Sequence, residues 1–227
     1  MDDLQRLKEI LSEVGAGRIW RPVYAPDDTL LSQGIGDRWD GLLEVLRKID
    51  FSGKTVGDLG CNFGYYTFMV KDAGARHVLG IDSDERVIEG CEILKRLYNI
   101  QDVFFKTADI AALDGIGVFD MGMMIDLIGK EKVKSGIMTT YLDVIERMSA
   151  KEMIFTIRPR YTIKKHLNHD FQGLSDKYPG VYIDGAYFSM LDYIRDRFRE
   201  NWEMSTLSTE KERGFEGKIA LHFSRKP

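Results

Sequence analysis

Val56-Gly57-Asp58-Leu59-Gly60-Cys61-Asn62-Phe63-Gly64-Tyr65-Tyr66-Thr67 is the most informative stretch of this 227-residue sequence. It follows a predicted strand over 54–59 and opens a predicted helix over 65–73. Between the two the backbone must turn sharply, and a ligand can approach closely only where no bulky Cβ stands in the way. Gly60 and Gly64 meet that need. Asn62 stands between them where glycine is more usual, and Asn is one of the few side chains that readily adopt left-handed conformations.

Outward from this stretch, short apolar runs alternate with segments of helical spacing. Such repeated β-α units predict an α/β fold with a mostly parallel sheet and helices on both of its faces. Near the end of the chain, two strand-like runs joined by a charged, Gly-containing turn predict an antiparallel C-terminal hairpin. Strands are predicted over 54–59, 77–82, 102–107, 118–125, 152–157, 203–209 and 218–224, helices over 4–14, 38–49, 65–73, 84–98, 131–148 and 187–202, and irregular chain over 18–36.

The amino-acid composition narrows the class of protein to which this chain can belong. Hydrophobic residues make up 44% and charged residues 30%, so we expect a chain that buries a core and stays soluble. A formal net charge of −4 disfavours extended, non-specific nucleic-acid binding but leaves room for a local basic patch. The sequence has neither the basic start and apolar run of a secretory signal nor the roughly 20 apolar residues that span a bilayer. We therefore expect a cytoplasmic protein without a membrane partner.

The stretch from Asp58 to Gly64 resembles motif I of the class I S-adenosylmethionine-dependent methyltransferases, an acidic residue and an apolar residue before a glycine-rich turn. Asn62 departs from that form, but the order of predicted elements resembles the family over most of the chain. The resemblance implies a Rossmann-like sheet and S-adenosylmethionine as the cofactor. It also implies that the loop from Gly60 to Gly64, including Cys61 and Asn62, holds the methionyl part, and that Asp58 orients its amino group.

Two further acidic residues lie at predicted strand ends. Asp82 comes about 20 residues after the first loop glycine, where a carboxylate can accept both ribose hydroxyls of a nucleotide. Ser83, beside it, is counted with the cofactor-binding residues. Asp109 and Ile110 resemble the family's adenine-binding pair, with Ile110 supplying a backbone contact. Taken singly, each acidic residue could equally be a helix cap.

Other cofactor classes fit less well. The dinucleotide fingerprint would require glycine at positions 62 and 65, where the chain has Asn62 and Tyr65, and this disfavours an NAD-dependent oxidoreductase. The two cysteines are too few for a cysteine-rich zinc site. His166 and His169 lack the clustered Cys or acidic partners of a metal centre, so we expect none.

Catalytic residues are harder to identify, because methyl transfer from a sulfonium depends mainly on in-line placement and exclusion of water. Asp126 follows the predicted strand over 118–125 and is the candidate for a general base, with a helix cap as the alternative. The family members that methylate adenine or glutamine carry Asn/Asp-Pro-Pro-aromatic there. This chain has Asp-Leu-Ile-Gly, which disfavours that subclass.

The segment after the fifth strand carries an excess of basic residues. Arg158 and Arg160, with Tyr161, begin a run that continues through Lys164 and Lys165. In the resembling family, insertions here commonly form the substrate side of the pocket. We therefore expect a small-molecule or nucleotide-type acceptor, and an anionic or nucleotide-like one if this segment binds it. A solvated surface loop is the competing interpretation.

The domain organisation follows from these parts. Residues 1–50 are predicted to form an N-terminal helical segment and lid, in which 32–40 closes over the cofactor. Residues 51–227 are predicted to form a Rossmann-like methyltransferase domain with a substrate-side insertion at about 158–186.

Two alternative functions remain. One is a non-catalytic cofactor-binding or partner subunit. The other is a tRNA-modifying (carboxy)methyltransferase, because 38–82 distantly resembles the tRNA wobble-uridine carboxymethyltransferases. The acceptor and the oligomeric state stay open.

Overall fold

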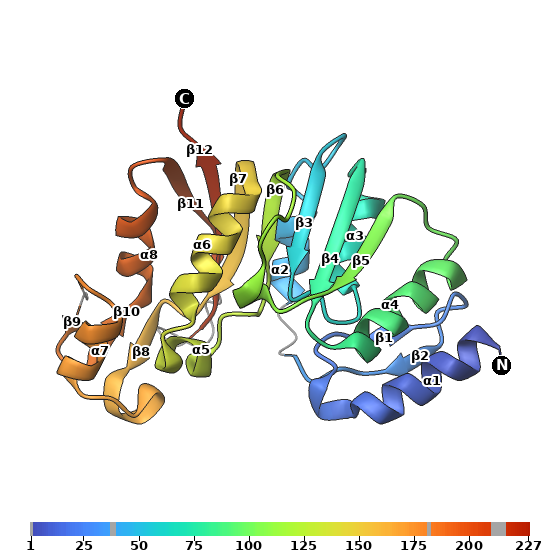
Figure 1. Cartoon of the computed structure of the whole chain (residues 1–227), viewed down its shortest axis with the longest axis horizontal. Helices are drawn as coiled ribbons and strands as arrows, with labels where there is room; N and C mark the ends of the chain where they lie inside the picture. Colours follow the sequence, from blue (N-terminus) through green and yellow to red (C-terminus); the bar gives the residue numbers. More distant parts are fainter. Residues whose placement is uncertain (1, 37–39, 181–182, 210–216) are drawn as a thin grey trace. The chain divides into compact units, whose positions relative to one another are not determined.

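The computed structural model describes the chain except residues 1, 37–39, 181–182 and 210–216 (Figure 1). It divides into two compact units. Unit 1 contains Met1–Arg38 and Ile49–Asp120, and unit 2 contains Trp39–Lys48 and Met121–Pro227. The chain therefore passes from unit 1 to unit 2 near the start of strand β6 (Phe119–Met124).

Unit 1 is built on parallel strands in the order β3-β4-β5, with bounds β3 (Thr55–Leu59), β4 (His77–Asp82) and β5 (Val103–Thr107). Thr55 lies opposite His77, and Val78 lies opposite Val103. The helices α3 (Tyr65–Asp72) and α4 (Glu85–Leu97) connect these strands and pack on them. Gly80 is required in β4, because an added Cβ would lie 2.8 Å from the Phe105 ring.

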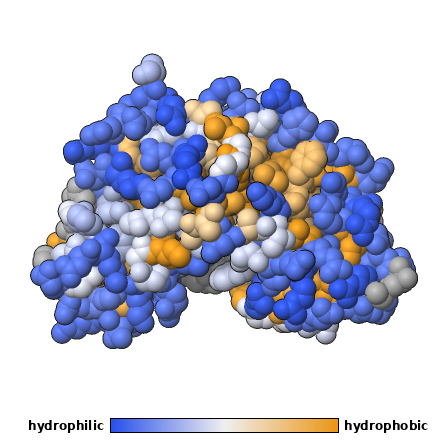
Figure 2. Space-filling model, viewed as in Figure 1, coloured by the Kyte–Doolittle hydropathy of each residue, from blue (hydrophilic) through white to orange (hydrophobic). Residues whose placement is uncertain are grey.

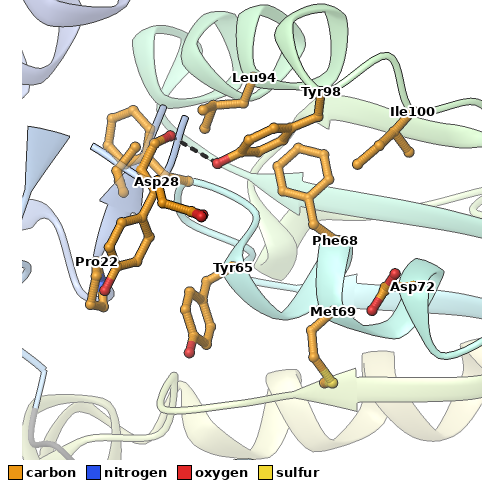
Figure 3. A pocket seen from close by; sticks show the side chains of 12 residues that line it. Pro22, Asp28, Tyr65, Phe68, Met69, Asp72, Leu94, Tyr98 and Ile100 are labelled. Carbon is orange, nitrogen blue, oxygen red and sulfur yellow. Dashed lines mark hydrogen bonds between the residues drawn. The ribbon is translucent and has the colours of Figure 1, made fainter. Parts of the chain in front are cut away.

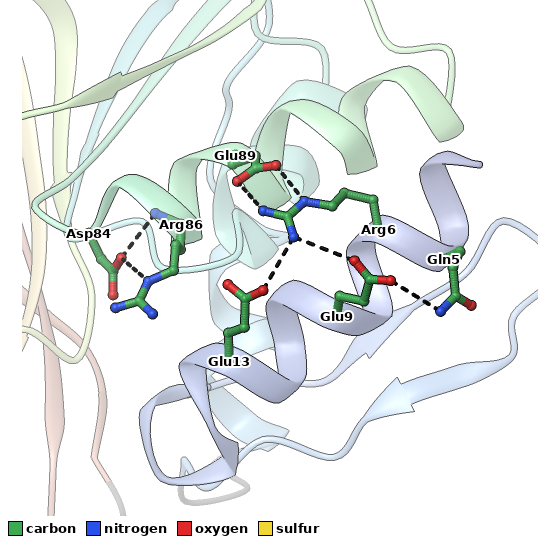
Figure 4. Close-up of polar contacts among 7 residues, drawn as sticks. All are labelled: Gln5, Arg6, Glu9, Glu13, Asp84, Arg86 and Glu89. Atoms are coloured by element: carbon green, nitrogen blue, oxygen red, sulfur yellow. Dashed lines mark hydrogen bonds and ion pairs between the residues drawn. The ribbon is translucent and has the colours of Figure 1, made fainter. Parts of the chain in front are cut away.

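Helix α1 (Asp3–Val14) docks on α4 through an apolar stripe. Its buried residues Leu7 and Ile10 recur at helical spacing and pack in one cluster with Cys91 and Leu94. Beside this cluster the Arg6 guanidinium holds both oxygens of Glu89, at 2.8 and 2.9 Å (Figure 4).

The segment predicted as irregular contains short elements. A 3₁₀ turn, η1 (Ala16–Arg18), follows α1, and β1 (Val23–Tyr24) pairs antiparallel with β2 (Leu30–Ser32). The prediction of irregular chain was wrong here. The strands have two and three residues, which is too short for an apolar alternation to be recognised in the sequence.

One face of the unit 1 strands carries apolar side chains that stay accessible (Figure 2). From β5 the chain reaches β6 through a short 3₁₀ turn, η2 (Ile110–Ala112), and the described residues between them form no longer helix. Phe104 is consequently 51% exposed.

Unit 2 contains strands in the order β11-β12-β7-β6, in which β12 runs antiparallel to both β11 and β7. The C-terminal hairpin prediction is thus confirmed. The interior is aromatic: Phe155 stacks on Phe223 with ring centroids 4.9 Å apart, and Phe198 meets Phe223 edge-on at 5.2 Å. The elements are α2 (Asp40–Leu46), α5 (Lys130–Ser135), α6 (Met138–Met148), β7 (Ser149–Ile157), α8 (Met190–Phe198), β11 (Trp202–Thr209) and β12 (Ile219–Arg225).

The segment predicted as a substrate-side insertion forms a small substructure of unit 2. A separate sheet has the order β8-β10-β9, and Phe188 in β10 lies opposite Tyr161 in β8. Tyr178 stacks on Phe188 with ring centroids 5.3 Å apart, which gives this part its own aromatic core. Its elements are β8 (Arg160–Thr162), the π-helix η3 (Ile163–Leu167), α7 (Phe171–Lys177), β9 (Ile183–Asp184) and β10 (Tyr187–Ser189).

Two helix predictions were too long. The helix predicted over 131–148 breaks into α5 and α6, because Gly136 adopts a φ of 88° and ends α5 in a left-handed cap. The helix predicted over 187–202 begins instead as β10, and α8 starts only after Ser189, whose hydroxyl accepts from the Asp192 N–H. In both cases a local capping residue overrides the apolar spacing. Among the described helices none is long and apolar enough to cross a membrane.

Candidate cofactor-binding site

The glycine loop after β3 has the backbone shape that the sequence predicts. Gly60, Asn62 and Gly64 have φ values of 74°, 47° and 76°, all in the left-handed region. The Gly60 and Cys61 N–H groups both donate to the carbonyl of Ile81, at 2.8 and 3.0 Å, which fixes the loop against the end of β4. A Cβ on Gly64 would lie 2.9 Å from the Phe68 ring. The loop therefore turns at the carboxyl end of β3 with little side-chain bulk.

Asp82 ties the end of β4 to this loop. Its Oδ2 accepts from the Asn62 N–H at 3.1 Å, and its Oδ1 accepts from the Asp84 N–H at 3.1 Å. The N-cap of α4 is Asp84, whose carboxylate accepts from the Arg86 N–H, so Asp82 is free of that capping role. A carboxylate offers about four acceptor positions, and Asp82 keeps capacity for two hydroxyl donors. Ser83, beside it, is exposed. Contact of either residue with a ribose stays a prediction.

Asp109 occupies the end of β5 as a cap. Its Oδ1 accepts from the Ala111 N–H at 2.9 Å and begins the turn η2. The capping alternative is therefore what the structure contains, and the carboxylate stays exposed with its other oxygen accessible. Ile110 is buried, with 5% of its surface exposed. Their contact with an adenine stays a prediction.

Asp58 is a buried carboxyl beneath the loop. Only 2% of its surface is exposed, and its Oδ2 accepts from the Thr67 hydroxyl at 2.6 Å. Burial raises the pKa of Asp58 to about 6, against the opposing effect of the Thr67 hydrogen bond, and the Asp82 charge adds to the rise. Among the described residues no cation is recorded beside this carboxyl group, and a ligand ammonium group would supply one.

Asn62 does more than adopt a left-handed backbone. Its side-chain Oδ1 accepts from the Trp20 N–H at 3.1 Å, and its Nδ2 donates to the Arg18 carbonyl at 3.0 Å. The Arg18 guanidinium also pairs with Asp84 at 2.6 Å. The amide thus fastens the N-terminal segment to the cofactor loop, a role that sequence reasoning missed because the partners lie more than 40 positions away.

Backbone hydrogen bonds also hold the later part of the N-terminal segment. The Ile35 N–H donates to the Ile19 carbonyl and the Gly36 N–H to the Trp20 carbonyl, each at 2.8 Å. Residues 32–36 of the predicted lid are therefore paired in unit 1, whereas 37–39 lie outside the described part. Closure of this segment over a cofactor stays a prediction.

The two cysteines lie together under the loop. The thiols of Cys61 and Cys91 point at the Asn62 carbonyl oxygen, at 3.5 and 3.1 Å. Burial raises the pKa of both thiols. Both are therefore poor nucleophiles, and they contribute packing rather than covalent chemistry.

Unit 2 presents its own polar cluster at the end of β6. Asp126 has a φ of 57°, and its N–H donates to the Thr156 hydroxyl at 2.8 Å. The Lys218 ammonium lies 2.9 Å from Asp126 Oδ1, and the two side chains are 25% and 7% exposed, respectively. Helix α5 is capped at Gly129, so Asp126 is not a helix cap. Lys218 was missed, because it lies 92 residues away in the sequence and carries no motif.

The basic residues of the insertion lie at its first strand. Arg158 and Arg160 are half-buried, and the Arg158 guanidinium lies 5.8 Å from the centre of the Tyr161 ring. Tyr161 itself is 2% exposed, and burial raises its pKa to about 12. Its ring therefore supports Arg158 from within the substructure. Substrate contact by these three residues stays a prediction.

Known proteins resemble this chain in sequence over part of its length. Residues 50–204 match the family model described as a methyltransferase domain. Among curated proteins, the tRNA U34 carboxymethyltransferase of Colwellia psychrerythraea is 31% identical over 83 residues, 37% of this chain and 25% of that protein. The protein of the same name from Helicobacter pylori is 27% identical over 124 residues, 53% of this chain and 43% of that protein. The chain therefore spans less than half the length of these relatives.

Solved structures agree on the fold. The magnesium protoporphyrin IX methyltransferase of Synechocystis PCC 6803 with bound SAH matches with a TM-score of 0.56 and 18% identity, over 82% of this chain and 81% of that one. The N-terminal domain of EvdMO1, determined with SAH and D-fucose, matches with a TM-score of 0.64 and 14% identity, over 100% and 98% of the two chains. The predicted Rossmann-like fold is confirmed. With the family match over residues 50–204, this chain belongs to the family of methyltransferase domains, and it has the Rossmann-like fold of the class I methyltransferases.

Proposed function

We propose that this chain binds S-adenosylmethionine at the loop from Gly60 to Gly64 and transfers its methyl group to a small anionic or nucleotide-type acceptor. The observation that carries the first half is the Asn62–Asp82 connection at 3.1 Å, which joins the loop to the carboxylate expected to hold a ribose. Two of the loop's three left-handed residues are glycines, which carry no side chain, and this suits close approach of a ligand.

The residues present fit this cofactor. Asp58 offers a buried carboxylate that a methionyl ammonium would stabilise, and Asp82 offers acceptors for two ribose hydroxyls. Asp109 and the backbone of Ile110 complete the set on the adenine side. When bound, the sulfonium supplies an activated methyl group. The task of the chain is then to orient both reactants and to exclude water.

On the acceptor side, Asp126 is better suited to positioning than to proton removal. Its Oδ1 already interacts with the Lys218 ammonium and lies 3.3 Å from the Thr156 hydroxyl, so both lone pairs of that oxygen are engaged. We propose that this cluster holds a polar group of the acceptor. Arg158 and Arg160 supply positive charge in the same unit, which favours an anionic acceptor.

A second candidate is transfer of a carboxymethyl group. The curated relatives that carry this name support it, with 31% identity over 83 residues in one of them. The extra carboxylate of such a cofactor would need a cation beside the methyl position. Comparing the affinities for S-adenosylmethionine and for its carboxylated analogue distinguishes the two, because a built carboxylate site makes the analogue bind more tightly.

The first test is calorimetric binding of S-adenosylhomocysteine to the wild type, to Asp82→Ala and to the control Asp176→Ala, which changes an exposed carboxylate of unit 2. We expect binding by the wild type and the control, and loss of binding by Asp82→Ala. Absence of binding by the wild type would overturn the proposal. Binding without turnover of any acceptor would favour the partner-subunit alternative.

The acceptor half needs its own measurement. We expect uridine monophosphate to bind more tightly than uridine, and Arg158→Gln with Arg160→Gln to remove that difference while leaving the affinity for S-adenosylhomocysteine unchanged. Equal binding of the nucleotide and the nucleoside by the wild type would refute an anionic acceptor of this type.

A further inference from the structure

A pocket lies in unit 1 beside α3. Its volume is about 620 Å³, which is the size of a small-molecule site. It is walled by α3, the end of α4 and the β1–β2 hairpin (Figure 3). Of the cofactor loop from Gly60 to Gly64 only Phe63 lines it, and Asp58, Asp82 and Asp109 do not. The pocket is therefore not explained by the proposed methyl transfer.

Helix α3 turns a second apolar face toward this pocket. Tyr66 and Val70 are buried, whereas Tyr65, Phe68 and Met69 line the pocket and are only half-buried. The spacing of Tyr65, Phe68 and Met69 places them on one side of the helix. A helix normally buries one apolar stripe. In this second stripe Phe68 also packs edge-on against Phe105 of β5, with ring centroids 5.6 Å apart, whereas Tyr65 and Met69 border the pocket.

Aromatic rings form the opposite wall. The Tyr98 hydroxyl donates to the Tyr24 carbonyl at 2.8 Å, and this bond holds the Tyr98 ring against the hairpin. Phe68 meets Tyr98 edge-on with ring centroids 5.7 Å apart. Tyr65, Phe68 and Tyr98 thus line the space with aromatic rings, and aromatic rings attract organic cations.

The charge of the lining is negative. Among the described residues that line the pocket, Asp28 and Asp72 are the charged ones, and both carboxylates are exposed. Asp28 comes from the hairpin turn and Asp72 ends α3, and Figure 3 shows them on opposite sides of Phe68. Burial and the nearby Asp28 charge raise the pKa of Tyr98, which is consistent with a carboxylate facing that ring. An organic cation would meet a carboxylate at either end.

We propose that this pocket binds a small organic cation with a methylated or alkyl ammonium group, held by the aromatic rings of Tyr65, Phe68 and Tyr98 and by the carboxylates of Asp28 and Asp72. The class of ligand follows from complementary charge, aromatic lining and volume together. Neutral apolar molecules would contact the aromatic rings but leave the two carboxylates without a counter-charge. Anions would be repelled by the carboxylates.

Choline and its neutral carbon isostere 3,3-dimethylbutan-1-ol provide the test, because they share size and shape and differ in charge. We expect titration calorimetry of the full chain at fixed ionic strength to show choline binding at least about fivefold more tightly than the isostere, as a cation–π contact of about 1 kcal/mol implies. Asp28→Asn combined with Asp72→Asn is expected to lower this preference, because the rings remain but both carboxylates are lost.

Asn at position 28 tolerates the left-handed backbone there, where φ is 63°, so the variant is expected to keep the turn. Glu131→Gln combined with Asp176→Asn, which also neutralises two exposed carboxylates, is the control for net charge and is expected to keep the preference. S-adenosylhomocysteine affinity should be the same in all of these variants, which separates this site from the proposed cofactor site. Equal affinity for choline and the isostere, absence of choline binding, or an unchanged preference in the double variant would overturn the proposal.

Discussion

Replacing Asp58 by Asn tests whether ionisation of this buried carboxyl group lowers the free energy of unfolding. The carboxyl is 2% exposed, and its pKa is about 6 in the folded chain against 3.8 for an unburied carboxyl. A difference of about two pKa units corresponds to about 3 kcal/mol. Because the folded state holds the proton more tightly, the free energy of unfolding falls as pH rises from about 4 to about 6, and stays low above that.

An Asn at this position does not ionise, so this loss should disappear. We expect Asp58→Asn to exceed the wild type in free energy of unfolding by up to about 3 kcal/mol near pH 7.5, with the difference shrinking toward zero near pH 4. Urea unfolding of the cofactor-free protein across this range measures it. Thr67→Val is the companion variant, because the Thr67 hydroxyl opposes the rise in the pKa of Asp58, and its removal should make the pH dependence steeper.

The same substitution should weaken the cofactor. A methionyl ammonium would lose its carboxylate partner, so the affinity for S-adenosylmethionine should fall while the stability of the free protein rises. If the stability difference between Asp58→Asn and the wild type is independent of pH between about 4 and 7, burial does not raise this pKa and the reasoning is refuted.

Three further changes test contacts between distant segments. Asn62→Gly keeps a residue that can adopt the local φ of 47°, but it loses both side-chain hydrogen bonds to the N-terminal segment. Trypsin should therefore cleave after Arg18 faster than in the wild type. An unchanged cleavage rate would contradict the fastening role of Asn62. Lys218→Met leaves Asp126, whose side chain is 7% exposed, without its ammonium partner. This change should lower the free energy of unfolding by about 1–3 kcal/mol, and adding Asp126→Asn should recover part of the loss. No loss of stability would mean that the ion pair is not stabilising. Ile10→Ala should cost about 2–5 kcal/mol in urea unfolding because the residue is fully buried between α1 and α4, and a cost below about 1 kcal/mol would show that α1 is only loosely docked.

Local features of the sequence were enough to predict the cofactor loop. Gly60, Asn62 and Gly64 are residue types that enter the left-handed region at low steric cost, so their backbone shape follows from residue identity alone. The strand ending at Asp82 and the helix after it could likewise be predicted, because apolar periodicity and caps act over a few residues. The same short-range logic failed at Gly136, where one glycine ended a helix that the apolar spacing had continued.

Tertiary structure alone decided which distant side chains meet. The Asn62 amide finds Arg18 and Trp20 across more than 40 residues, and Lys218 finds Asp126 across 92. The pocket beside α3 likewise requires the hairpin that carries Asp28 to fold against that helix. Residue identity and spacing describe interactions within a turn or two of backbone. Contacts between remote segments depend on how whole elements pack, and no short stretch of sequence carries that information.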